Sequence, residues 1–150
     1  MKKQFLSSFI LAGFLANSQT LNADYANVSN QVSQNNIITY LQEFESLGVK
    51  TTGSNANNNA YNWLKNKYLS FGFAEADIAK DSFNYNGQTT SNIIVTKTGS
   101  KFPNIYIIVC GHYDTITGTG TNDNGSGVSV ILEVARLLKN IPTEYSIKFI

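Results

Sequence analysis

The sequence predicts an α/β fold in which a mixed, largely parallel central sheet is flanked by helices. Three segments, at residues 37–47, 60–71 and 127–140, carry apolar residues at helical spacing. Short runs rich in β-branched and aromatic residues, bounded by turn residues, lie between the second and third of these segments and after the third. From residue 105 to 150 the order is strand, loop, helix, strand, which is the order of a βαβ unit with parallel strands.

Length and composition indicate an ordinary globular domain. The chain has 150 residues, 42% hydrophobic and 14% charged, which is enough for one small domain with a core. Removing Lys2 and Lys3 from the 11 basic residues leaves 9 against 10 acidic residues. Because this balance creates no field that attracts nucleic acid or anionic membranes, neither is an expected partner. The single cysteine, Cys110, lies in an apolar run and is expected to be a small buried core residue.

Residues 1–23 have the layout of a secretory signal peptide. Lys2 and Lys3 supply a positive start, residues 5–16 are mostly apolar, and a polar segment then ends at Ala23. We expect cleavage there, a mature chain of residues 24–150, and a secreted or periplasmic location. The apolar stretch is shorter than the ~20 residues that span a bilayer, so no stable membrane insertion of the mature chain is expected.

Two amphipathic helices are predicted in the first half of the mature chain. The first covers residues 37–47, and Gly48 is suited to end it. Residues 51–59 are polar and rich in asparagine, and we interpret them as a loop with N-capping residues rather than a low-complexity linker. A second apolar stripe at helical spacing follows over residues 60–71, and Gly72 closes that helix.

The next segments are predicted to form strands. Residues 81–85 and 91–97 flank Asn86-Gly87, a pair that favours a tight hairpin turn because both positions tolerate positive φ. Residues 99–103 are expected to form another turn. Residues 105–110 are apolar at nearly every position, which is typical of a central strand buried on both faces.

A third helix and a last strand complete the predicted order. Over residues 127–140, an inner apolar stripe is expected to face the sheet, with Glu133, Arg136 and Lys139 outside. Pro142 stops this helix, and residues 144–150 resume strand character. Because no further element follows, we expect the domain to continue beyond Ile150.

The glycine-rich loop at residues 111–127 is the candidate site. Open α/β sheets bind ligands at the carboxyl ends of their strands, which is where this loop lies. It contains the only histidine of the chain, His112, together with Asp114 and Asp123. His112 and Asp114 are two residues apart, so in extended backbone their side chains point to the same side. Imidazole is the commonest metal ligand, and a nearby carboxylate fixes its tautomer and basicity.

Taken alone, these residues leave other interpretations open. A lone histidine at a strand end is more often a hydrogen-bonded surface residue, and Asp123 by itself is more often a helix cap or turn residue. The loop lacks the third glycine of a dinucleotide-binding fingerprint and the lysine of a P-loop. Ser126 lies between two glycines, as in a nucleophile elbow, but Asn124 stands where that motif has its first glycine.

The longer pattern resembles the co-catalytic zinc aminopeptidase family, peptidase family M28. The matching residues are Gly-His-Tyr-Asp at 111–114, Asp-Asn-Gly-Ser-Gly-Val at 123–128 and the helical Glu-Val-Ala-Arg at 133–136. Thr-Gly-Ser-Asn-Ala at 52–56 is similar to the N-terminal segment of the family, more weakly. The resemblance covers nearly all of the mature chain, is specific from residue 91 to 150, and implies a fold like that of zinc peptidases.

The resemblance implies a metallo-aminopeptidase that uses water activated by two zinc ions to remove N-terminal residues from peptide substrates. His112 would bind one zinc, Asp123 would bridge both, and Asp114 would orient His112 as the residue usually counted as catalytic. The general-base glutamate and the remaining ligands of the family come after the strand that ends at Ile150. We therefore expect residues 24–150 to be the N-terminal part of a catalytic domain, inactive by itself.

Two rival hypotheses remain. A glutaminyl cyclase-like zinc enzyme shares the His-Tyr-Asp segment, although the Asp-Asn-Gly-Ser-Gly segment fits the peptidase pattern better. The other hypothesis is a non-catalytic fragment that binds metal weakly or merely folds.

Overall fold

The structure is a computed structural model that describes residues 22–150, so the predicted signal peptide lies outside the described residues except for its last two. The elements in chain order are α1 (Ala23–Ser29), α2 (Gln34–Ser46), α3 (Asn55–Ser70), the 3-10 turn η1 (Glu75–Asp77), β1 (Ile78–Tyr85), β2 (Gln88–Lys97), β3 (Phe102–Val109), the irregular helical turn η2 (Thr121–Ser126), α4 (Gly127–Leu138) and β4 (Tyr145–Phe149). Within residues 22–150, no helix combines the length and the apolar character needed to cross a membrane.

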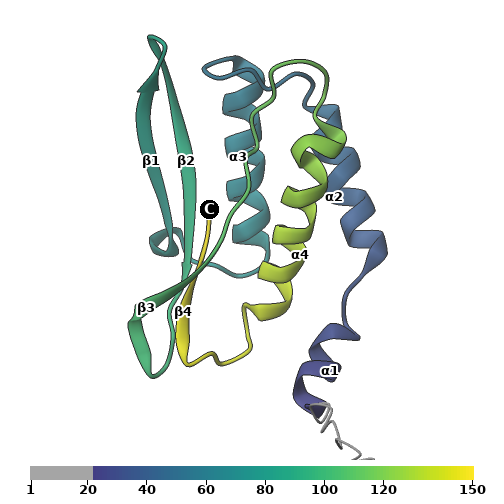
Figure 1. The fold of residues 1–150 in the computed structure, drawn as a ribbon, viewed down its shortest axis with the longest axis vertical. Helices are drawn as coiled ribbons and strands as arrows, with labels where there is room; N and C mark the ends of the chain where they lie inside the picture. Colours follow the sequence, from purple (N-terminus) through teal and green to yellow (C-terminus); the bar gives the residue numbers. More distant parts are fainter. Residues whose placement is uncertain (1–21) are drawn as a thin grey trace, which may run out of the picture.

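The four strands form one mixed sheet in the order β1-β2-β4-β3 (Figure 1). β3 and β4 are parallel, which confirms the predicted βαβ unit. The pairs β1–β2 and β2–β4 are antiparallel, so among the described strands the sheet is mixed but not largely parallel. For β1 and β2 the reason is local, because the two-residue turn at Asn86 (φ 49°) and Gly87 (φ 78°) can join only antiparallel neighbours.

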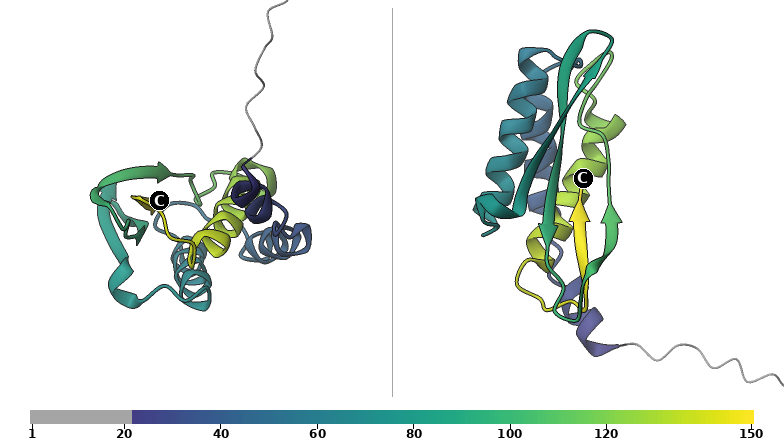
Figure 2. Two further views of the ribbon diagram at one scale, coloured as in Figure 1. Left: turned by 90° about the horizontal axis from the view of Figure 1, so that it is seen from below. Right: turned by 90° about the vertical axis from the view of Figure 1, so that its left-hand side faces the viewer.

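Helices α2, α3 and α4 lie together on one side of the sheet (Figures 1 and 2). α2 begins after Ser33, whose side chain accepts a hydrogen bond from the backbone N–H of Asn36, and Gly48 follows its last turn with φ 77°. Ser54 caps α3 in the same way, so the asparagine-rich residues 55–59 are helical. The predicted loop was therefore wrong for these five positions, because the capping residue is Ser54 and not an asparagine.

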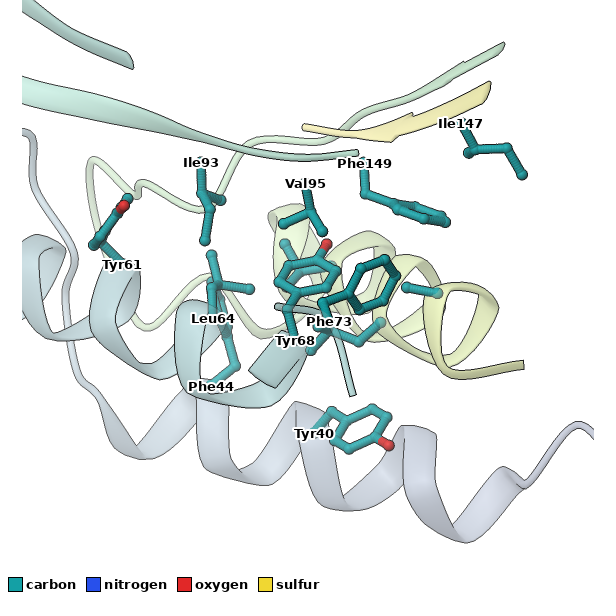
Figure 3. Packing of buried hydrophobic residues seen from close by; sticks show 13 residues of the cluster. Tyr40, Phe44, Tyr61, Leu64, Tyr68, Phe73, Ile93, Val95, Ile147 and Phe149 are labelled. Carbon is teal, nitrogen blue, oxygen red and sulfur yellow. The ribbon is translucent and has the colours of Figure 1, made fainter. Parts of the chain in front are cut away.

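The core fills the space between the helices and the inner face of β2 and β4. Figure 3 shows Tyr68 of α3 beside Phe73 and Phe149, and its ring centroid lies 5.8 Å and 6.3 Å from theirs. Each buried aromatic ring removes about 150–250 Å² from water, so this cluster is a large part of the hydrophobic stabilisation. Burial also raises the pKa of the Tyr68 hydroxyl.

The prediction of a central strand at residues 105–110 was wrong for the described chain. β3 lies at the edge of the sheet and pairs only with β4. The apolar side chains at residues 105–108 are exposed, from 44% at Tyr106 to 60% at Ile108. Cys110, predicted to be buried, is exposed as well. An apolar strand sequence indicates that a strand suits burial on both faces, but the packing of neighbouring elements decides whether it is buried.

Glu133 is a second correction, because it lies inside the protein and not on the outer face of α4. Its side chain is 2% exposed and accepts hydrogen bonds from the Ser33 backbone N–H (2.8 Å), the Asn36 amide (3.3 Å) and the Arg136 guanidinium (2.7 and 2.8 Å). The bonds from Arg136 hold the pKa of the Glu133 carboxyl below its usual range, against the opposing effect of burial. Glu133 thus joins the N-terminus of α2 to α4.

The stability contributed by Glu133 should depend on pH. Because its pKa is lower in the folded protein than in the unfolded chain, this contribution is full above the ordinary glutamate pKa of about 4.3 and is lost as the pH falls through the folded value. We expect Glu133→Gln to lower the free energy of unfolding by about 1–3 kcal/mol at neutral pH, and by less in acid. Urea unfolding at both pH values measures this difference.

The matched control is Glu45→Gln, which changes an exposed glutamate of α2. It should alter the free energy of unfolding by no more than about 0.5 kcal/mol. An equal loss for Glu133→Gln at neutral and acid pH would contradict the assigned charge interaction.

Candidate metal centre

The loop between β3 and α4 brings the predicted site residues together. His112 and Asp123 are eleven residues apart, yet His112 Nε2 lies 3.0 Å from Asp123 Oδ1. The loop leaves the parallel strand β3 at its carboxyl end and returns through η2 to the start of α4 (Figure 1). Both side chains are accessible, with exposed fractions of 52% and 90%. This edge of the sheet therefore presents an imidazole and a carboxylate side by side to solvent.

Asp114 lies beside Nδ1, the second ring nitrogen of His112. His112 Nδ1 is 3.1 Å from the Asp114 backbone oxygen and 3.4 Å from Asp114 Oδ1. A proton on Nδ1 can be donated to these oxygens, which leaves Nε2 as the nitrogen that can bind a metal. The structure thus places Asp114 where it can orient His112, as the spacing of the two residues predicts.

Tyr113 anchors the segment between His112 and Asp114. Its hydroxyl donates a hydrogen bond to the backbone oxygen of Ser91 on β2. Burial raises the pKa of Tyr113 to about 12, so this hydroxyl stays a donor at neutral pH. This bond ties the loop to the sheet between the two site residues.

Asn124 occupies the narrow space between the end of β3 and the start of α4. A side chain at Gly111 would bring its Cβ within 2.8 Å of Asn124 Nδ2, and one at Gly127 within 2.3 Å of Asn124 Oδ1. The peptide bond between Asp123 and Asn124 is cis, and the φ/ψ values of both residues are non-helical within η2. The glycines of this loop are therefore needed for close packing around Asn124, a role that their spacing alone did not reveal.

The donor set fits part of a zinc site. Two donors bound to one zinc at about 2.0–2.2 Å with a tetrahedral angle lie about 3.3–3.6 Å apart, a little more than the 3.0 Å between His112 Nε2 and Asp123 Oδ1. Zinc binds both imidazole nitrogen and carboxylate oxygen. Within residues 22–150, no cluster of three or more histidine, cysteine, aspartate or glutamate side chains is placed to hold a metal. At this edge the described residues therefore bring together two donor groups of the kind that zinc binds.

An open groove of about 570 Å³ lies beside these residues. His112 and Asp114 line it on one side, and Phe83 and Tyr85 of β1 line it on another. The two aromatic side chains are 42% and 56% exposed. The groove is thus large enough for a small peptide segment, with polar groups and aromatic surface in the same space.

The geometry of the loop gives less support to Ser126 as a nucleophile. The Ser126 hydroxyl donates to the backbone oxygen of Asn122 at 2.7 Å, while the only histidine faces Asp123 and Asp114. A serine nucleophile needs a base within hydrogen-bond reach, and His112 is engaged elsewhere. The arrangement thus favours a pair of accessible donor groups over a serine nucleophile.

Comparison with known proteins shows which family this part of the chain is similar to. The sequence model of peptidase family M28 matches residues 92–150. Aminopeptidase YwaD of Bacillus subtilis is 46% identical over 69 residues, which is 44% of this chain and 15% of the relative. The chain thus spans about one seventh of the length of that relative.

Solved structures share the fold. LapB from Legionella pneumophila superposes with a TM-score of 0.73 at 23% identity, over 85% of this chain and 36% of that protein. A glutaminyl cyclase from Fimbriiglobus ruber gives 0.66 at 20% identity, over 79% of this chain and 44% of its own. At these identities the likeness establishes the α/β architecture alone, which both solved structures share.

Proposed function

We propose that this chain belongs to a zinc-dependent exopeptidase that releases N-terminal residues from peptides. The observation that supports this proposal most is the pair His112 and Asp123, held 3.0 Å apart at the carboxyl edge of the sheet. The match of residues 92–150 to peptidase family M28 and the identity with a bacterial aminopeptidase point to the same chemistry.

The residues have separate tasks in this proposal. His112 Nε2 and the Asp123 carboxylate would hold metal, with Asp123 shared between two zinc ions. Asp114 would accept the Nδ1 proton of His112 and so keep the imidazole in the tautomer that leaves Nε2 free. Zinc bound there would supply an activated water and a charge that polarises the scissile carbonyl. The groove beside His112 would receive the peptide.

The proposal extends to the setting of the enzyme. The layout of residues 1–23 supports export as a secreted or periplasmic protein, with peptides as substrates. Because the described residues provide only two metal-binding side chains at this edge, the 150 residues alone are proposed to be inactive.

The test uses the protein at its full natural length and the 150-residue chain in parallel. We expect the full-length protein to hydrolyse aminoacyl-p-nitroanilides, to lose this activity in a chelator and to regain it with zinc. The 150-residue chain should show no turnover with or without added zinc. Chelator-resistant hydrolysis by the full-length protein would reject the metal mechanism, and turnover by the short chain would reject the claim of inactivity.

A glutaminyl cyclase activity is the second candidate, supported by the shared fold of the Fimbriiglobus ruber enzyme. Peptides with N-terminal glutamine discriminate the two activities. A peptidase releases free glutamine, whereas a cyclase releases ammonia and leaves a pyroglutamyl peptide of otherwise unchanged length. Mass spectrometry of the products separates these outcomes.

A further inference from the structure

Lys50 is a buried cation that the proposed mechanism does not use. It lies in the connection between α2 and α3, is 0% exposed, and its ammonium donates three hydrogen bonds to backbone oxygens. Two acceptors, Phe44 (3.1 Å) and Gly48 (2.7 Å), belong to the last turn of α2 and the residues after it. The third is Thr119 (2.8 Å), in the loop that carries the metal-site residues.

The charge of Lys50 is compensated mainly by backbone oxygens, and the Glu45 carboxylate attracts it without forming an ion pair. None of the ion pairs found within residues 22–150 includes Lys50. Only the protonated ammonium has three donors for its three carbonyl acceptors, and the Phe44 ring centroid lies 3.9 Å from Nζ. Burial itself lowers the pKa of Lys50, so the protein bears a desolvation cost to keep a charge here. An apolar side chain would fill the same space without this desolvation cost.

The backbone of Lys50 contacts the same loop at a second point. Its N–H donates to the Thr115 hydroxyl (2.7 Å), and its carbonyl oxygen accepts from the Thr115 N–H (3.1 Å). Figure 1 shows the segment between β3 and α4 passing beside the α2–α3 connection where these bonds form. Thus Lys50 holds both Thr115 and Thr119, which lie between His112 and Asp123 in the sequence.

Gly120 connects these two held points to the backbone of Asp123, because it packs closely against both Thr115 and Asp123. Gly120 follows Thr119, and a Cβ added to Gly120 would lie 2.2 Å from the Thr115 side chain and 2.7 Å from the Asp123 backbone oxygen. The Gly120 backbone oxygen also accepts the N–H of Gly125 at 2.8 Å. The path from Lys50 to Asp123 therefore consists of hydrogen bonds and close packing, with little free space.

We propose that Lys50 is a positioning residue for the metal centre, which holds the 111–127 loop against the end of α2 so that Asp123 stays opposite His112. Its role in metal binding rests on the proposed zinc site, whereas its role in ordering the loop does not. Outer groups that orient metal ligands change metal affinity by about 10–100-fold, which sets the expected size of the effect.

The test variant is Lys50→Met in the protein at its full natural length, because methionine nearly matches the length of lysine without charge or donors. We expect faster hydrogen–deuterium exchange at residues 115–125, unchanged exchange in β2 and α3, and zinc affinity reduced by about 10–100-fold. Lys50→Arg, which keeps charge and donors, should recover part of both losses. The exchange measurement is made without metal, so it remains informative if the wild-type protein binds no zinc, a result that would reject the proposed function.

The control is Lys67→Met, which removes a different lysine that is only partly buried. The Lys67 ammonium pairs with Glu43 and lies 5.2 Å from the Tyr40 ring centroid. It should leave loop exchange and zinc affinity as in the wild type. The proposal would be overturned if the loop of Lys50→Met exchanged hydrogen for deuterium as slowly as the wild-type loop. Faster exchange throughout the domain with unchanged zinc affinity would overturn it as well. If Lys50→Met does not fold, Thr115→Val tests the same link, with about a 3–10-fold loss of zinc affinity expected and no loss contradicting it.

Discussion

Replacing Asp123 with alanine is expected to abolish tight zinc binding and to reduce peptidase activity of the full-length protein by at least about 10³-fold. Metal-ion catalysis contributes several kcal/mol to transition-state stabilisation, and each 1.4 kcal/mol corresponds to about tenfold in rate. Asp123 is the carboxylate in contact with His112 Nε2, so its removal takes away one of the two metal donors that the loop brings together. Metal content by elemental analysis and kcat/KM on an aminoacyl substrate measure the effect.

The specificity of this effect is checked with Asp81→Ala on β1. Asp81 is also exposed, and its side chain accepts a hydrogen bond only from the Asn92 amide among the described contacts. It should leave zinc content and activity at wild-type values. Because the Asp123 side chain is 90% exposed, its loss should cost little folding stability. Full zinc content in Asp123→Ala would reject the ligand role.

Phe44→Ala is expected to cause the largest loss of folding stability, about 3–5 kcal/mol in the free energy of unfolding. The Phe44 side chain is 0% exposed and lies between α2 and the loop of the candidate site. A Cβ added to Gly125 would come within 2.7 Å of its ring, and the Lys50 ammonium lies 3.9 Å from the ring centroid. Truncation would leave a cavity and remove the aromatic face beneath a buried cation.

Chemical unfolding of Phe44→Ala and of a control on the same helix, Ile38→Ala, measures this loss. Ile38 is 43% exposed, so its truncation should cost less than about 1 kcal/mol. If Phe44→Ala lowers the free energy of unfolding by less than about 1 kcal/mol, the residues around Phe44 collapse into the cavity. The close packing around Phe44 would then contribute little to folding stability.

Much of the fold follows from local sequence patterns. The apolar spacing of α2, α3 and α4, the Asn86-Gly87 turn and the strand–helix–strand order from β3 to β4 all matched the structure because each depends on residues near in sequence. Apart from the loop predicted at residues 55–59, which is the first part of α3, the failures concern longer-range packing. The apolar residues of β3 are at an exposed edge, and Glu133 is buried because the N-terminus of α2 supplies its partners from about 100 residues away.

For the candidate site, too, the sequence indicates the residue types, and the tertiary structure determines their proximity. The residue types at 112, 114 and 123 are compatible with metal chemistry, since imidazole and carboxylate side chains are groups that zinc binds, but only the resemblance of the longer pattern to peptidase family M28 favoured that interpretation. Their proximity in space is a tertiary property. It depends on Asn124 packed between two glycines and, in our proposal, on Lys50, which lies 62 positions before His112 and whose buried ammonium holds the loop between His112 and Asp123. No local pattern marks Lys50 for this role, because its acceptors are backbone oxygens, and only folding determines which of these lie within its reach.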